Sequence, residues 1–125
     1  MRATETALVE LGADGVLSVR VRTAAAQSVA NAKENLSAAL EMAAGHRRPL
    51  LVDISEALPL DAEVRHYYSG QVLVDGFTAL AMVVHASPLG RMMGNVYLRV
   101  ARPGIPTRLF TEADMARAWL MAHRQ

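Results

Sequence analysis

The chain has 125 residues, of which 52% are apolar and 20% charged, and its net charge at neutral pH is +1. This length predicts a single domain over residues 1–125, and the near-zero charge excludes a dedicated nucleic-acid binder, since such proteins carry a strong basic excess. Cysteine is absent, which excludes disulfides, a thiol nucleophile and thiolate metal sites.

The N-terminal segment contains acidic residues and has no apolar run of signal-peptide length, and no run in the chain reaches the length of a membrane-spanning helix. We therefore expect a cytoplasmic protein with no membrane span. The histidines lack metal-ligand spacing, and nucleotide-binding or serine-nucleophile motifs are missing. We expect no catalytic residues, no metal ion and no cofactor.

The chain opens with two short segments of alternating polarity. Apolar and polar residues alternate through 6–11 and 16–22, and this period of two is typical of half-buried strands. The intervening Gly-Ala-Asp-Gly at 12–15 supplies turn residues that tolerate a positive φ. The pattern predicts a β-hairpin.

A long helix is predicted next, over 24–44. Thr23 is placed to cap its start and Gly45 to end it. Apolar residues recur at alternating spacings of four and three, which gives one apolar stripe, and Gln27 lies off it. The stripe consists of Ala25, Val29, Ala32, Leu36, Ala39 and Ala43.

Two segments, 49–54 and 77–86, are apolar almost throughout. Such runs are typical of strands in a parallel sheet that helices cover on both faces. The intervening segment predicts a helix over 61–74. The expected class is therefore α/β, with a mixed sheet and helices packed against it.

The remaining elements complete the predicted order ββαβαβαβα. Ser87, followed by a proline, predicts a helix cap and a third helix over 88–100. A short strand follows at 106–110, and Thr111 resembles the first residue of a capping box that opens a last helix.

The segment LLVDISEALPLDAEV at 50–64 resembles the STAS domains of bacterial anti-sigma-factor antagonists. That family has a buried strand that ends in Asp-Leu-Ser, which Asp53, Ile54 and Ser55 match. Asp61 stands where the family's next helix opens. The resemblance implies a STAS-like fold and a non-catalytic regulatory or protein-interaction module.

The C-terminal half, 81–120, is similar to small bacterial proteins grouped with the STAS and SEC14-like superfamily. The similarity includes a segment with the pattern Phe-Thr-x-x-x-x-Ala-x-x-Trp-Leu. SEC14-like relatives imply an alternative function, which is binding of a small apolar or anionic, lipid-like ligand.

The chain departs from the STAS pattern where phosphorylated members carry serines. It has Ala62 and Glu63 there, and Val64 replaces a glycine. We expect a module without the usual phosphoacceptor serine, with Glu63 as a permanent negative charge that imitates phosphate in part. The alternative is that Asp61 caps the helix and Glu63 favours its positive end.

Two clusters are candidate binding sites. Asp53, Ser55, Asp61 and Glu63 follow a strand whose carboxyl end is where open α/β sheets bind ligands. We expect a structural or partner-facing role here, and cation binding or acid–base chemistry is the alternative. In the basic segment 76–111, which lacks acidic residues, Ser87 and Arg91 could hold an anion, although solvated surface arginines give the same pattern.

Met92 and Met93 lie in the third predicted helix, which is apolar over much of its circumference. Such a helix is buried on two sides or contacts a partner. A homodimer and ordinary core packing predict the same stripe. We therefore expect a partner protein or a second copy of the chain, and an apolar or anionic ligand as the alternative.

Overall fold

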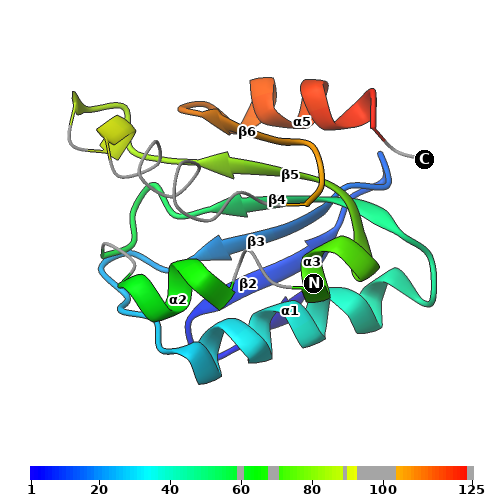
Figure 1. The fold of residues 1–125 in the computed structure, drawn as a ribbon, viewed down its shortest axis with the longest axis horizontal. Coiled ribbons are helices and arrows are strands. Elements are labelled where there is room, and N and C mark those ends of the chain that lie inside the picture. Colours follow the sequence, from blue (N-terminus) through cyan, green and yellow to red (C-terminus); the bar gives the residue numbers. More distant parts are fainter. Residues whose placement is uncertain (59–60, 68–70, 89, 93–103, 124–125) are drawn as a thin grey trace.

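A computed structural model describes residues 1–58, 61–67, 71–88, 90–92 and 104–123. Six strands form one sheet in the chain order β1 to β6 (Figure 1). The pairs β1–β2 and β2–β3 are antiparallel, and β3 to β6 run parallel. The strands are β1 (Arg2–Ala3), β2 (Ala7–Leu11), β3 (Leu17–Val21), β4 (Arg48–Asp53), β5 (Phe77–Val83) and β6 (Thr107–Phe110). The predicted α/β class with a mixed sheet is confirmed.

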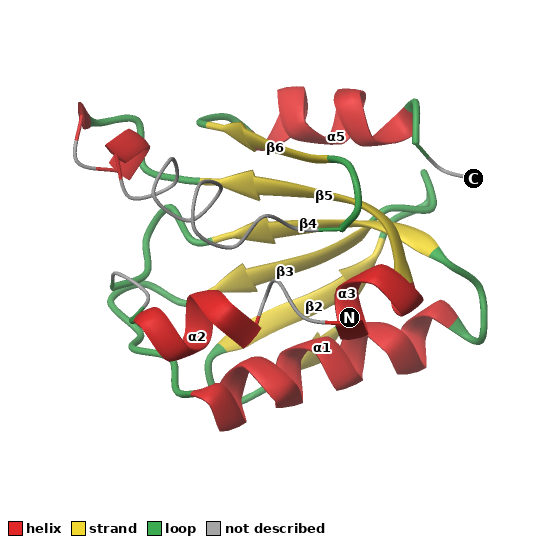
Figure 2. Cartoon of the chain, viewed as in Figure 1, coloured by secondary structure: helices red, strands yellow, loops and turns green. Residues whose placement is uncertain are grey.

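Helices cover the two faces of this sheet unequally (Figure 2). One face of the sheet, which we call the α1 face, packs against α1 (Val29–Ala43), α2 (Ala62–Tyr67) and α3 (Gln71–Gly76) in the larger core. The opposite face, which we call the α5 face, packs against α5 (Ala113–Met121), and this helix contacts β4, β5 and β6. In Figure 1, α1 lies alongside β2 and α5 lies alongside β6. The helix α5 therefore lies beside the part of the α5 face that β2 and β3 form and does not cover it.

The polarity of each strand follows from this coverage. In β4, Leu50 and Val52 join the larger core, whereas Leu51 joins the smaller core beneath α5, so the continuous apolar run of a doubly covered strand is confirmed. In β3, Leu17 is fully buried and Arg20 is exposed. The hairpin strands are half-buried, as their alternation predicts.

The first helix begins later than predicted. It is capped by Ser28, whose side chain accepts a hydrogen bond from the Asn31 backbone in a capping box, and not by Thr23. The start over 24–28 is wrong because Ala24 adopts a left-handed φ of 57° and its N–H donates to the Glu56 carbonyl. That contact with a distant segment outweighs the helix propensity of the alanine run. The predicted end is confirmed, with Gly45 at a φ of 86°.

Other boundaries also differ. The helix predicted over 61–74 is described as the separate helices α2 and α3, with 68–70 outside the described residues. Glu112, and not Thr111, is the N-cap of α5, with no side-chain cap hydrogen bond. The third predicted helix is described only at 88 and 90–92, which are helical, and its remainder, with Met93, lies outside the described residues.

Four buried polar side chains form one hydrogen-bonded network between the sheet and α1. Asn35, which is fully buried, donates from Nδ2 to Thr6 Oγ1 at 3.0 Å and to Gln27 Oε1 at 3.1 Å. The hydroxyl of Thr4 donates to Asn35 Oδ1. The network ties the turn between β1 and β2, which holds Thr4 and Thr6, and the segment before α1 to the helix. Gln27 is thus buried, although the stripe predicted for 24–44 leaves it outside.

Candidate functional site

The carboxyl ends of β3 to β6 lie at one edge of the sheet, and the loop 54–58 leaves β4 there (Figure 1). Asp53 fixes the start of this loop, since its Oδ1 accepts hydrogen bonds from the Ser55 N–H at 2.9 Å and the Ser55 Oγ at 2.6 Å. The structure thus brings together two residues of the first predicted cluster. One carboxylate oxygen of Asp53 is engaged within the loop itself.

The segment 22–28 braces the same loop. The Ala24 N–H donates to the Glu56 carbonyl at 2.7 Å, and the Leu58 N–H donates to the Ala25 carbonyl at 3.1 Å. The Ala57 N–H closes a turn on the Ile54 carbonyl at 3.2 Å. These backbone hydrogen bonds hold the loop in a fixed conformation, although most of its side chains are partly or fully exposed.

Leu58 is 46% exposed on this ordered loop. The acidic residues Glu56, Asp61 and Glu63 are exposed and lie within five positions of it in the chain. We call Glu56, Leu58, Asp61 and Glu63 the Leu58 surface. It comprises one exposed apolar side chain and three exposed carboxylates that are close to one another in the sequence.

Asp61 also has a local structural role. Its Oδ1 accepts a hydrogen bond from the Val64 N–H at 3.0 Å, and Glu63 lies in the first turn of α2. Capping by Asp61 is therefore confirmed. Among the described residues, no cluster of three or more acidic, histidine or cysteine side chains is arranged to hold a metal ion.

Ser87 caps the short helical turn that follows β5. Its Oγ accepts from the Gly90 N–H at 3.1 Å, and its carbonyl accepts from the Arg91 N–H at 3.0 Å. A side chain at Gly90 would overlap the His85 carbonyl, so only glycine fits there. Arg91 is exposed and Met92 is 56% exposed. The cap is confirmed, and anion binding at Ser87 and Arg91 stays a prediction.

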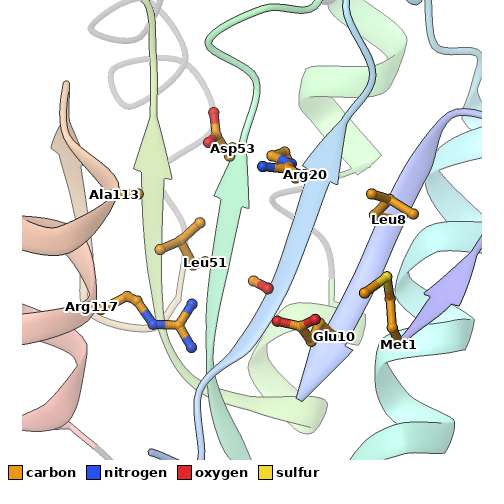
Figure 3. Close-up of a pocket in the computed structure, with 9 residues that line it drawn as sticks. Met1, Leu8, Glu10, Arg20, Leu51, Asp53, Ala113 and Arg117 are labelled. Carbon is orange, nitrogen blue, oxygen red and sulfur yellow. The ribbon is translucent and has the colours of Figure 1, made fainter. Parts of the chain in front are cut away.

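A hollow of about 230 Å³ lies on the uncovered part of the α5 face, beside α5 (Figure 3). We call it the sheet groove. Sequence reasoning identified one of its lining residues, Asp53, as a site candidate. The lining consists of Met1, Leu8, Glu10, Ser18, Arg20, Leu51, Asp53, Ala113 and Arg117.

Strand register orders the charges in the sheet groove. Leu8 of β2, Arg20 of β3 and Asp53 of β4 form one cross-strand row, and Glu10 pairs with Ser18 in the next row. Within the described part of the chain, neither Glu10 nor Arg20 forms a side-chain hydrogen bond or ion pair. The groove therefore presents a carboxylate and a guanidinium that bind no other protein group there.

Arg117 reaches into the groove from α5 (Figure 3) but is already paired. Its Nε and Nη2 donate to the two carboxylate oxygens of Asp14 in the hairpin turn, at 3.0 and 3.1 Å. Burial raises the pKa of Asp14, but the hydrogen bonds from Arg117 and from the Val16 N–H, with the Arg117 charge, outweigh it, so the pKa lies below its usual value. The bidentate pair joins the turn to the last helix.

We expect Asp14→Asn to lower the free energy of unfolding by about 0.5–1 kcal/mol at neutral pH, because the pair is partly exposed and screened by water. The pKa of Asp14 is lower in the folded chain than in the unfolded chain. The stabilisation by the ion pair is therefore complete above the pKa of the unfolded chain, and it disappears as the pH falls through the pKa of the folded chain. Urea unfolding of both proteins between pH 7 and pH 2 measures this. The difference should shrink below about pH 4. An undiminished difference at pH 2 would contradict the assignment, and Glu56→Gln is the exposed control.

The sheet order and the packing on both faces define a SpoIIAA-like α/β protein, as a structural comparison shows. The solved structure of an uncharacterized protein of the DUF3478 family from Shewanella loihica PV-4, with a SpoIIAA-like fold, matches 96% of this chain and 98% of its own, with a TM-score of 0.60 and 15% identity. This likeness shows the fold, and the predicted STAS-like architecture is confirmed at that level.

The chain belongs to the family DUF7793, a domain of unknown function, whose model matches residues 10–124. A protein of unknown function from Arthrobacter sp. FB24 aligns over 96% of each chain at 25% identity, with a TM-score of 0.37. No curated protein matches the sequence. In the described part of the chain, no helix has the length and apolar character needed to cross a bilayer.

Proposed function

We propose that the protein is a non-catalytic interaction module that binds a regulatory partner protein through the Leu58 surface. The observation that carries the proposal is the exposure of Leu58 on a loop that backbone hydrogen bonds hold in place. An apolar anchor with a polar rim is the usual composition of an interaction hot spot. A loop that is already ordered loses little conformational entropy when it binds.

The charge of the Leu58 surface specifies the partner's chemistry. The three exposed carboxylates favour lysine and arginine around an apolar pocket that accepts Leu58. Glu63 stands where phosphorylated STAS domains carry serine, and Ala62 beside it has no hydroxyl. The module would thus keep its negative charge without a kinase, and its binding would not be switched by phosphate at these positions.

Site-specific photo-cross-linking in the native cell tests this proposal. A photoreactive amino acid at position 58 should form an adduct with one partner protein, identified by mass spectrometry. Glu63→Lys in the same chain should reduce that adduct strongly, because it reverses one charge of the rim. Position 115 is the matched control, since Met115 is 60% exposed on α5.

Equal adducts from positions 58 and 115, or an adduct that Glu63→Lys leaves unchanged, would contradict the proposed surface. Light scattering on the purified native chain then separates two kinds of partner. A homodimer that Glu63→Lys dissociates would identify the partner as a second copy of the chain. A monomer would direct attention to a different protein.

A second candidate function is the binding of a small ligand, which the sheet groove favours. Four of its nine lining residues are charged: Glu10, Arg20, Asp53 and Arg117. A lipid chain would have to desolvate these groups. The groove thus supports a small polar ligand better than a lipid-like one.

A further inference from the structure

The sheet groove combines an apolar side chain with two opposite charges. Leu8, which is partly exposed, contributes apolar surface, Leu51 is almost fully buried in the lining, and Arg20 and Glu10 contribute the charges. Arg20 pairs across the strands with Leu8, and Glu10 lies two residues further along β2. The two charged residues are therefore diagonal neighbours on one face, with their Cα atoms about 7–8 Å apart.

Each charged group retains hydrogen-bonding capacity. Neither Arg20 nor Glu10 uses its side chain in a hydrogen bond or ion pair among the described residues. Asp53, opposite Arg20 in the next strand, directs one oxygen to Ser55. A guanidinium is a fork-shaped receptor for a carboxylate, and a carboxylate accepts hydrogen bonds from an ammonium group.

We infer that the sheet groove binds a free α-amino acid with an apolar side chain. Arg20 receives the ligand's carboxylate, Glu10 receives its ammonium group, and Leu8, which neighbours both residues, contacts its side chain. Both charges of the zwitterion are thereby matched by groups that have no other protein partner among the described residues.

The size of the groove agrees with such a ligand. Its volume of about 230 Å³ is small, which favours a compact ligand. Drug-sized ligands occupy larger pockets, of about 300–1,000 Å³. Charge also discriminates, because a simple anion would leave Glu10 without a partner and a simple cation would leave Arg20 without one.

Isothermal titration of the native chain with L-leucine tests the inference, with L-methionine and L-phenylalanine as further probes. We expect binding with a Kd of about 1 mM or tighter. Isocaproate, which lacks the ammonium group, and isoamylamine, which lacks the carboxylate, should each bind at least about tenfold more weakly.

The variants Arg20→Gln and Glu10→Gln should each weaken leucine binding by about tenfold or more. Their circular dichroism should match that of the native chain, because both residues are exposed. Glu63→Gln, on the Leu58 surface, is the matched control and should bind leucine normally. Its separate location keeps a failure of this inference distinct from a failure of the proposed partner surface.

Two results would overturn the inference. One is the absence of binding for all three amino acids at about ten times the expected Kd. The other is isocaproate or isoamylamine binding as tightly as leucine, which would identify a simple ion site. If a peptide segment of the Leu58 partner bound the groove while free leucine did not, the groove would belong to the protein interface instead.

Discussion

Replacement of Leu120 by alanine is expected to destabilise the protein by about 3 kcal/mol and to detach α5 from the sheet. Leu120 is fully buried, and it and Ala116 are the fully buried residues of α5. They pack on Leu51, Ala79, Ala81 and Val83 in the smaller core. Alanine already occupies position 116, so Leu120 is the larger of the two fully buried side chains that hold the helix, and Trp119 packs partly buried against the same core.

Tryptophan fluorescence during urea unfolding measures this effect, because Trp119 is the chain's single tryptophan. Its ring lies 5.8 Å from that of Phe110 and 4.5 Å from that of His123, centroid to centroid. In Leu120→Ala the emission of Trp119 should shift to longer wavelength at a lower urea concentration than the main change in the circular dichroism of the protein. Met115→Ala is the control on the same helix and should stay within about 0.5 kcal/mol of the native chain. Equal stability of the two variants would show that Leu120 does not anchor the helix.

Asn35→Ala is expected to cost about 2–3 kcal/mol, since it leaves several buried polar groups without their partner. Asn35 binds the side chains of Thr4, Thr6 and Gln27, and all four residues are buried. Water has little access to replace the lost hydrogen bonds. The cost therefore exceeds that of an exposed helix substitution.

Urea unfolding of Asn35→Ala and of Ser37→Ala, an exposed position in the same helix, measures the difference. Thr6→Val combined with Asn35→Ala should cost less than the sum of the two single changes, because the two residues share one hydrogen bond. Additive costs would contradict a coupled network.

The Asn35 network also bears on the proposed partner surface. Gln27 belongs to the segment 22–28, whose Ala24 and Ala25 bond to the Leu58 loop. Loss of Asn35 should therefore increase amide hydrogen exchange at Leu58, beyond what global destabilisation explains, because it loosens the segment that braces the loop. Asn35 is in this sense a positioning residue for Leu58.

Periodicity predicted the elements that are governed by burial alone. The alternation in 16–22 and the continuous apolar run at 49–54 each follow from how many faces of a strand are covered, and both were correct. The sequence also contains the Ser-x-x-Asn motif of the capping box at Ser28, but the alanine run before it favoured an earlier helix start. The two-residue β1 is too short for any period to show.

The sites depended on contacts between distant segments. The exposure of Leu58 follows from hydrogen bonds between the segment 22–28 and the loop 54–58, which no local pattern encodes. The sheet groove exists because α5 covers β4 to β6 and leaves β2 and β3 open. Asp53 was predicted as a site residue from its place at a strand end, whereas neither Glu10 nor Arg20 was predicted as one.

The ion pair between Asp14 and Arg117 joins residues that are 103 positions apart. Closing so long a loop costs more chain entropy than a contact of short sequence separation does. The β2–β3 hairpin can form from neighbouring residues within microseconds, whereas α5 needs β4, β5 and β6 as its docking platform. Assembly of the groove wall is therefore a late event in folding. During synthesis on the ribosome, the α5 face of β4 and β5 stays uncovered until α5 leaves the exit tunnel.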